Sequence, residues 1–109
     1  MSKTRRLQAG LVIIWKFQVT AAKRRRFESV YGAKGEWARF FRRGKGYVRT
    51  ELTRLTGTPL SYVTLDFWLS RKAYDTFQKR HRAEYAALDR KCESLTRKET
   101  LIGYFQNLS

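Results

Sequence analysis

The stretch from Tyr62 to Leu95 constrains the fold most, because its hydrophobic period changes once along its length. The residues before Ser70 are β-branched and aromatic, a composition typical of a β-strand. After Ser70, apolar and aromatic residues recur at steps of three or four, the spacing of one face of a helix. Those residues are Tyr74, Phe77, His81, Tyr85, Leu88, Cys92 and Leu95. Ser70 is a favourable N-cap, because its hydroxyl can accept from an N–H of the first turn. The stretch predicts a buried strand followed directly by one long helix.

Other segments complete the predicted order of elements. A strand is expected over Leu11–Val19, with apolar residues on both of its faces, so it should be central in the sheet. Helical turns are expected over Thr20–Gly32 and around Trp37–Phe41. Two more strands are expected over Tyr47–Leu55 and around Leu101–Gln106. The order βαββαβ predicts an α+β, ferredoxin-like sandwich, with an antiparallel sheet and its helices on one face.

The central strands carry large apolar side chains on both faces, although the helices of such a sandwich cover only one. In the first strand, Ile13 shares one face with Trp15 and Phe17, and we assign Ile13 to the outward face. In the third strand, Val63, Leu65 and Phe67 lie on one face, and Tyr62 and Trp68 lie on the other. An apolar sheet face left in water needs a cover, most simply a second copy of the chain. We therefore expect a homodimer formed through the sheet faces.

The segment Trp68-Leu-Ser-Arg-Lys-Ala-Tyr74 resembles the hallmark of the antibiotic biosynthesis monooxygenase family. That hallmark is a strand ending in Trp, a capping Ser, and an Ala–aromatic pair in the first helical turn. The first strand and the strand after Gly46 also fit, so the resemblance spans roughly residues 11–106. It implies a dimeric α+β barrel, in which two sheets pack face to face. It also implies one of several roles, among them cofactor-free oxygenases acting on polycyclic phenols, haem-degrading enzymes, and proteins of no known activity.

Haem degradation fits this chain poorly. The haem-degrading branch uses an Asn on the first strand and a Trp and a His on the second helix, whereas the only Asn here is Asn107. Aligned on Trp68, the helix Trp and His fall on Phe77 and Ala87. The resemblance instead implies a monooxygenase-like protein that binds an aromatic or phenolic small molecule. The alternative is a non-enzymatic dimer of the same fold that binds a small ligand or associates with nucleic acid.

Two ionisable residues are candidates for catalysis. His81 is the only histidine, so a Ser/His/Asp triad or a metal site built from several histidines is not supported. It is either a satisfied core histidine or the group that takes a proton from a phenolic substrate. Asp66 is either paired with Arg49 or Lys16 on a neighbouring strand or lines a pocket, where it could take that proton instead.

The aromatic residues supply a candidate substrate pocket between sheet and helices. Its predicted residues are Tyr31, Trp37, Tyr62, Trp68, Phe77 and Tyr85. Packing of a core would use the same residues, so this alternative stays open. The sequence contains no Walker loop, G-x-G-x-x-G, C-x-x-C or H-E-x-x-H motif, so we expect no cofactor and no metal.

The charge is unusual, with 24 Lys and Arg against 9 Asp and Glu and a net charge of +15. Such a chain attracts nucleic acid and anionic surfaces. The order βαββαβ is also that of the RNA recognition motif, and Lys45-Gly-Tyr47 begins like its aromatic signature. Val48-Arg49-Thr50 then supplies no second stacking aromatic, and the segment lies on the second strand instead of the third. We expect only unspecific, salt-dependent binding of nucleic acid.

Length and composition indicate a basic arm over residues 1–10 and one domain over residues 11–109. Apolar residues make up 42% of the chain, which is too many for a disordered segment. A single cysteine, Cys92, cannot form an internal disulfide and is expected to be a small buried hydrophobe. No stretch reaches the length of a membrane span, and the apolar run Leu11–Trp15 is too short for a signal peptide. We expect a cytoplasmic protein without a membrane partner.

Overall fold

The computed structural model describes residues 9–108. Along the chain these residues form the strands and helices in the order expected from the sequence, with one additional helix. The elements are β1 (Leu11–Gln18), α1 (Arg24–Tyr31), α2 (Glu36–Phe41), β2 (Tyr47–Arg54), β3 (Ser61–Trp68), α3 (Arg71–Arg80), α4 (Arg82–Cys92) and β4 (Lys98–Gln106). Short 3₁₀ turns, η2 (Ala21–Lys23) and η3 (Glu93–Leu95), precede α1 and follow α4.

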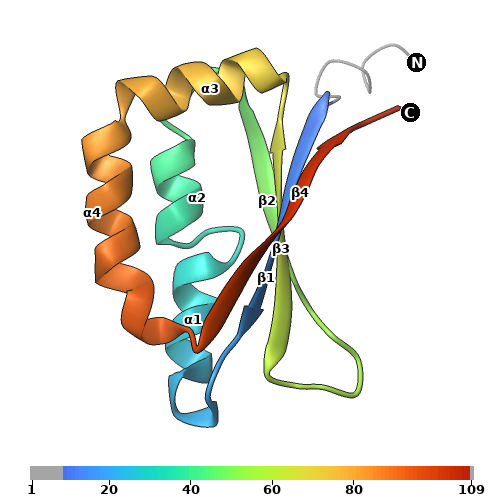
Figure 1. The fold of residues 1–109 in the computed structure, drawn as a ribbon, viewed down its shortest axis with the longest axis vertical. Helices are drawn as coiled ribbons and strands as arrows, with labels where there is room; N and C mark the ends of the chain where they lie inside the picture. Colours follow the sequence, from blue (N-terminus) through green and yellow to red (C-terminus); the bar gives the residue numbers. More distant parts are fainter. Residues whose placement is uncertain (1–8, 109) are drawn as a thin grey trace.

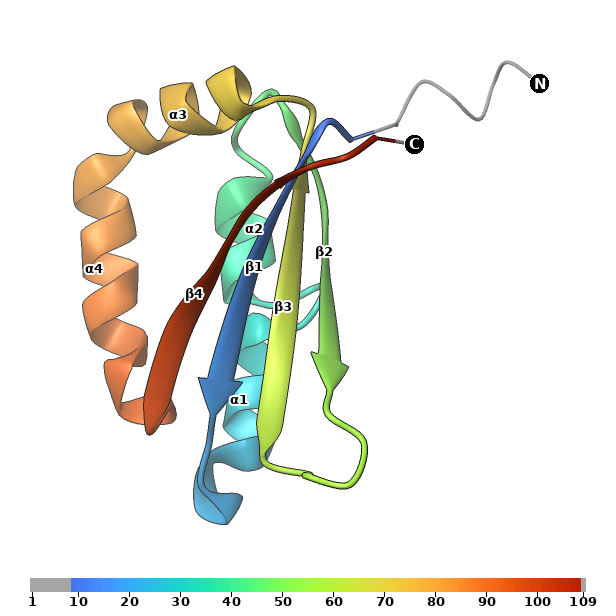
Figure 2. The same cartoon turned by 45° about the vertical axis from the view of Figure 1, so that its right-hand side comes forward.

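The strands pair antiparallel in the order β2-β3-β1-β4, so β1 and β3 are central. The helices of residues 9–108 all lie on one face of the sheet, and none of them covers the opposite face (Figure 1). The turned view in Figure 2 shows the same arrangement, with α4 ending near the start of β4 and with α1 and α2 behind the central strands. The predicted ferredoxin-like α+β sandwich is confirmed.

Aromatic side chains fill the space between the sheet and the helices. The ring of Phe27 on α1 is fully buried and lies 5.4 Å from Phe17, 4.4 Å from Tyr31 and 4.7 Å from Tyr62, measured between ring centroids. Each such pair adds about 0.5–1.5 kcal/mol beyond the burial of its area. The predicted role of Cys92 is also confirmed, because it is buried in this core as a free thiol.

The long helix expected after Ser70 is divided into α3 and α4 at His81, where φ is −116° and ψ is 31°. The chain turns there because α3 lies across one end of the sheet and α4 runs back along it (Figure 1). The hydrophobic spacing in the sequence does not indicate this break, because the i to i+4 hydrogen bonds of the helix continue on both sides of His81. The N–H of His81 donates to Phe77 at 2.9 Å, and the N–H of Tyr85 donates to the His81 carbonyl at 2.9 Å.

The predicted N-cap is confirmed, since the hydroxyl of Ser70 accepts from the backbone N–H of Ala73 at 3.0 Å. Ser70→Ala should therefore lower the free energy of unfolding by about 1 kcal/mol, measured by urea denaturation. Ser94→Ala is the matched control, because Ser94 lies inside η3 and not at the start of a helix; its effect should stay within about 0.5 kcal/mol. Equal losses in the two variants would contradict the capping role.

A β-bulge changes the faces of β2. Strict alternation would put Tyr47 on the same face as Arg49, but the register with β3 shifts between these two residues. An inserted residue moves the side chains before it to the other face. Tyr47 consequently lies on the helix-covered side, with its ring 5.4 Å from Trp68.

The helix-free face is apolar, as expected, but the assignment of Ile13 to it was wrong. Ile13 is only 2% exposed and belongs to the core beneath the helices. The helix-free face instead carries Val12, Ile14, Val63, Leu65 and Phe67, which are half-buried. Because both sets of alternate residues are apolar, the pattern alone does not indicate which set the helices cover.

Most of the predicted basic arm lies outside the described residues. Its last two residues join the sheet: the N–H of Gly10 donates to the Trp68 carbonyl at 3.0 Å, and the Asn107 amide donates to the Ala9 carbonyl at 2.9 Å. Over residues 9–108, no helix is both long and apolar enough to span a membrane.

Candidate functional site

A cavity of about 200 Å³ lies between the sheet and the helices. All four strands and three of the helices contribute to its lining, so the whole sandwich shapes it. The lining residues are Trp15, Phe17, Tyr31, Trp37, Phe41, Thr50, Thr64, Asp66, Tyr85, Asp89 and Glu99. Six of these are aromatic, two are threonines and three are carboxylic acids. Such a lining, mostly apolar with a few polar groups, is typical of small-molecule sites.

Asp66 is held on the sheet side of this cavity by a chain of hydrogen bonds. Thr50 stands opposite Asp66 in the β2–β3 register, and its hydroxyl donates to Asp66 Oδ1 at 2.7 Å. The Tyr47 hydroxyl lies 2.8 Å from Thr50 Oγ1 and must donate to it, because the only hydrogen of the Thr50 hydroxyl is already used. The β-bulge that turns Tyr47 inward is therefore what completes the chain Tyr47–Thr50–Asp66.

Burial raises the pKa of the Asp66 carboxyl to about 6, and the hydrogen bond from Thr50 opposes this shift only in part. The carboxyl is thus largely ionised at neutral pH but remains a better proton acceptor than an exposed aspartate. Asp66 has no ion pair with Arg49 or Lys16. Arg49 pairs with Glu51 at 2.9 Å and lies 3.9 Å over the Phe67 ring on the helix-free face. Of the two alternatives left by the sequence, the structure places Asp66 in a cavity.

Tyr31, Trp37 and Tyr85 line the cavity, as predicted. The Trp37 ring packs edge-on against Tyr85 at 5.1 Å and lies 6.2 Å from Tyr31. Burial raises the pKa of both tyrosines, so these walls stay uncharged at physiological pH. Hydrogen bonding from the Trp37 side chain offsets a part of the rise in the pKa of Tyr31 and of Cys92.

Asp89 and Glu99 are the exposed members of the lining. Partial burial raises the pKa of Glu99, and the nearby charge of Asp89 raises it further. No Lys, Arg or His lines the cavity in the described part of the chain. The charge of the cavity is therefore opposite to that of the whole protein. The same residues 9–108 contain no group of three or more His, Cys, Asp or Glu side chains able to hold a metal ion.

Three of the predicted pocket residues, Tyr62, Trp68 and Phe77, do not line this cavity. Tyr62 and Trp68 are packed in the core, with exposed fractions of 2% and 0%. The Tyr62 hydroxyl donates to Glu28, away from Asp66. Phe77 contacts Phe40 and lines a second, separate pocket. Tyr62 and Trp68 lie on the helix-covered face of β3 as expected, but in a part of the sandwich that is tightly packed.

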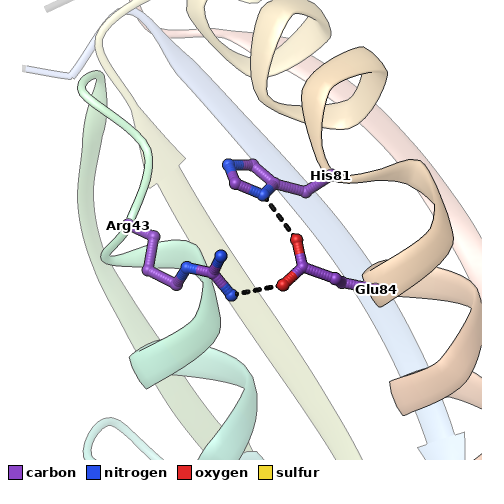
Figure 3. Close-up of polar contacts among 3 residues, drawn as sticks. All are labelled: Arg43, His81 and Glu84. Atoms are coloured by element: carbon purple, nitrogen blue, oxygen red, sulfur yellow. Dashed lines mark hydrogen bonds and ion pairs between the residues drawn. The ribbon is translucent and has the colours of Figure 1, made fainter.

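His81 lies in that second pocket and not with Asp66. Its side chain is 14% exposed and its Nδ1 lies 2.8 Å from Glu84 Oε1, while Arg43 Nη1 donates to the other oxygen of Glu84 at 2.9 Å (Figure 3). The ring also packs 4.6 Å from Phe77. The two candidate proton acceptors are therefore held in different pockets, and only Asp66 meets the aromatic cavity.

Several lining residues were not predicted, namely Trp15, Phe17, Phe41, Thr50, Thr64, Asp89 and Glu99. A signal existed for two of them. Thr64 stands two residues before Asp66 on the same strand and shares its face, and Asp89 follows Tyr85 by one helical turn. Thr50 and Glu99 reach the cavity only through the registers of β2 and β4, which the sequence does not contain.

No protein-family model matches the chain, and no curated protein matches it either. Solved structures do. One is a mutant form of SnoaB from Streptomyces nogalater, described as a cofactor-independent oxygenase; it is 24% identical, with 94% of this chain and 96% of that chain covered and a TM-score of 0.72. A candidate antibiotic biosynthesis monooxygenase from Deinococcus radiodurans is 11% identical, with 91% and 93% covered and a TM-score of 0.70.

A third similar structure is a dimeric ferredoxin-like protein from an uncultured marine organism. It is 12% identical, with 99% of this chain and 96% of that chain covered and a TM-score of 0.67. At these identities the likeness concerns the fold. The chain has the ferredoxin-like fold found in structures named as antibiotic biosynthesis monooxygenases, as the resemblance of its Trp68–Tyr74 segment implied.

Proposed function

We propose that the protein is a cofactor-independent monooxygenase that oxidises an aromatic phenol in the cavity between sheet and helices. One observation carries the proposal: a buried carboxyl with a pKa of about 6 lies in a cavity whose other walls are mostly aromatic. A general base is most effective when its pKa lies near the working pH. The fold shared with SnoaB, which is described as a cofactor-independent oxygenase, supports the same reaction class.

In the proposed reaction Asp66 takes a proton from the bound phenol or from an acidic ring carbon conjugated with it. The resulting electron-rich anion passes one electron to dioxygen, and the two radicals combine to form a carbon–oxygen bond. The proton held by Asp66 then passes to the peroxide, giving a hydroperoxide. Asp66 removes the remaining hydrogen of the same ring carbon as the O–O bond breaks, and this second proton joins the departing hydroxide to form water. In sum, a ring CH₂ and O₂ become a ring C=O and H₂O. The substrate supplies all electrons, so the balance needs no other reductant.

The charges of the cavity favour a neutral substrate. The cavity is lined by Asp66, Asp89 and Glu99 and by no cation of residues 9–108, although the protein as a whole is positive. An anion that enters it would meet like charge. We therefore propose that the phenol binds protonated and is ionised only by Asp66. The aromatic walls would stack on the rings of the substrate and exclude water.

We also propose that the protein works as a homodimer joined through the helix-free sheet face. That face is apolar, and it extends onto β4 through Phe105, which stands opposite Val12 in the β1–β4 register and is 43% exposed. A partner sheet packed on this face would remove most of that area from water. A similar structure is described as a dimeric ferredoxin-like protein, which supports this assembly.

The function is tested with a panel of anthrones, naphthols and quinols. Trp15 and Trp37 line the cavity, so binding should quench tryptophan fluorescence. Turnover should consume one dioxygen per carbonyl formed, followed with an oxygen electrode and mass spectrometry, and ¹⁸O₂ should label the product. Binding without oxygen uptake would assign a non-enzymatic ligand-binding role, and neither binding nor uptake would refute the proposal.

His81→Ala supplies an internal control for the assignment of the base. Because His81 lines the second pocket and not the cavity, this variant should keep the oxidation rate within about threefold of the unchanged protein. If His81 were the base, the rate should fall by about 100-fold or more with the fold intact. Circular dichroism at the assay temperature shows whether the variant is folded.

A further inference from the structure

The second pocket, of about 480 Å³, lies between the loop that joins α2 to β2 and one side of α3. Its lining consists of Arg43, Gly44, Lys45, Gly46, Ser70, Lys72, Ala73, Thr76, Phe77, Arg80 and His81. It shares no residue with the cavity that holds Asp66. The proposed oxidation does not use this pocket, so the residues that line it are candidates for a separate binding site.

Its charge is one-sided. Within the described part of the chain, every ionisable residue of the lining is basic and none is a carboxylate; these residues are Arg43, Lys45, Lys72, Arg80 and His81. Three of these cations, Lys45, Lys72 and Arg80, have no ion pair with a carboxylate in residues 9–108. Cations gathered around one hollow repel each other, so an anion bound there would stabilise the whole group.

The two walls of the pocket are held together by close packing of glycines. A Cβ on Gly46 would lie 2.3 Å from the Cβ of Ala73, and a Cβ on Gly44 would lie 2.7 Å from the Phe77 ring. The loop therefore sits directly on α3. This contact keeps the cations of the loop beside those of the helix before any ligand arrives, which lowers the cost of binding.

Two of the five basic residues, Arg43 and His81, already bind a carboxylate of the protein, that of Glu84. Glu84 on α4 accepts from Arg43 Nη1 at 2.9 Å and lies 2.8 Å from His81 Nδ1 (Figure 3). The guanidinium and the imidazole thus converge on one carboxylate group. The hydrogen bonds from His81 and Arg43 hold the pKa of Glu84 below its usual range, so this internal anion stays charged. It occupies Arg43 and His81 and leaves the other three cations without an anion.

We propose that this pocket is a binding site for a phosphorylated small molecule. Three unoccupied cations match the two or more charges of a phosphate ester or diphosphate better than the single charge of a carboxylate. The pocket is also larger than a phosphate ion requires, which leaves room for an organic group. The N-terminus of α3 is not the basis of the site, because Ser70 already accepts from its first turn.

The test uses inorganic pyrophosphate as the probe, titrated at about 150 mM salt, near physiological ionic strength, and followed by calorimetry and amide chemical shifts. We expect saturable binding of one pyrophosphate per chain, with shift changes confined to residues 43–46, 70–73 and 76–81. Lys72→Gln with Arg80→Gln should weaken it at least about tenfold. The charge-matched control, Lys23→Gln with Arg25→Gln on exposed residues of η2 and α1, should change affinity less than about twofold.

Glu84→Gln provides a test in the opposite direction. Removing the internal anion leaves Arg43 and His81 without their carboxylate, so pyrophosphate should bind several-fold more tightly, while Glu93→Gln at the far end of α4 should have little effect. Equal weakening by both double variants, or no saturable binding at that salt concentration, would overturn the site. Tighter binding of a single-stranded oligonucleotide than of pyrophosphate, lost in the same variant, would also overturn it and assign the pocket to nucleic acid.

Discussion

Replacing Asp66 with asparagine is expected to stabilise the protein above pH 6. The Asp66 carboxyl has a pKa of about 6 in the folded chain and 3.8 as its ordinary value, so the folded state binds the proton more tightly than the unfolded state. The wild-type protein therefore loses stability as the pH rises from about 4 to about 6 and regains none above it. A pKa difference of about two units between the folded and unfolded states corresponds to about 3 kcal/mol in the free energy of unfolding. This is an upper value for the stability gained by Asp66→Asn.

Urea denaturation at pH 4 and pH 8 checks this result. The two proteins should differ little at pH 4, where Asp66 is protonated in the folded state and the pH lies close to its unfolded pKa of 3.8, and Asp66→Asn should be more stable at pH 8. Asp75→Asn is the control, because Asp75 is exposed and pairs with Arg71 at the surface; its effect should stay within about 0.5 kcal/mol at both pH values. A lower stability of Asp66→Asn at pH 8 would contradict the account.

The same variant should lose at least about 100-fold in oxidation rate, because an amide cannot take a proton. Some functional groups lower the stability of the fold that holds them. Replacing such a group raises stability and lowers activity, which is the result expected for Asp66→Asn. A buried aspartate serving the fold alone would give the reverse, since its removal would destabilise the chain.

The second large effect is expected at the helix-free sheet face. Leu65 lies near the middle of β3 on that face, among the apolar residues that we propose to join two copies of the chain. Leu65→Glu would place a charge in the buried interface, at a cost of several kcal/mol. Sedimentation at micromolar concentration should show twice the chain mass for the wild type and the chain mass for the variant.

Leu55→Glu is the matched control for the dimer. Leu55 is half exposed and follows β2 at the start of the turn toward β3, beyond the apolar group of the sheet face. This variant should sediment as the wild type does. A wild-type protein that sediments as a monomer, or equal dissociation by both substitutions, would refute the proposed interface. Circular dichroism distinguishes a dissociated Leu65→Glu chain from an unfolded one.

Local patterns were sufficient to predict the elements of this fold. The alternating strand before Ser70, its capping hydroxyl and the apolar spacing after it all reappear in β3 and α3. The same patterns did not predict the turn at His81, because the helical hydrogen bonds continue on either side of it. They also did not contain the face of Ile13. A strand that is apolar on both sides gives no sign of where the helices lie, and only tertiary packing decides it.

The candidate site was predictable where one element supplied the signal. Asp66 was found because a carboxylate inside an apolar strand is unusual, and Trp37 and Tyr85 were found on their helical faces. The hydrogen bonds that hold Asp66 depend on the β2–β3 register and on the bulge after Tyr47, which are relations between strands. His81 was singled out because it is the only histidine, and the turn between α3 and α4 places it in the other pocket.

We propose that Asp66 takes the proton of a phenol in the aromatic cavity. The pH dependence of kcat/KM for oxygen uptake tests it most directly, because this ratio reports the ionisation of the free enzyme's base. We expect kcat/KM to rise through a single ionisation near pH 6 and to stay level above it. His81→Ala should keep this profile, and Asp66→Asn should lose it. A profile without that ionisation, or one that Asp66→Asn leaves unchanged, would contradict it.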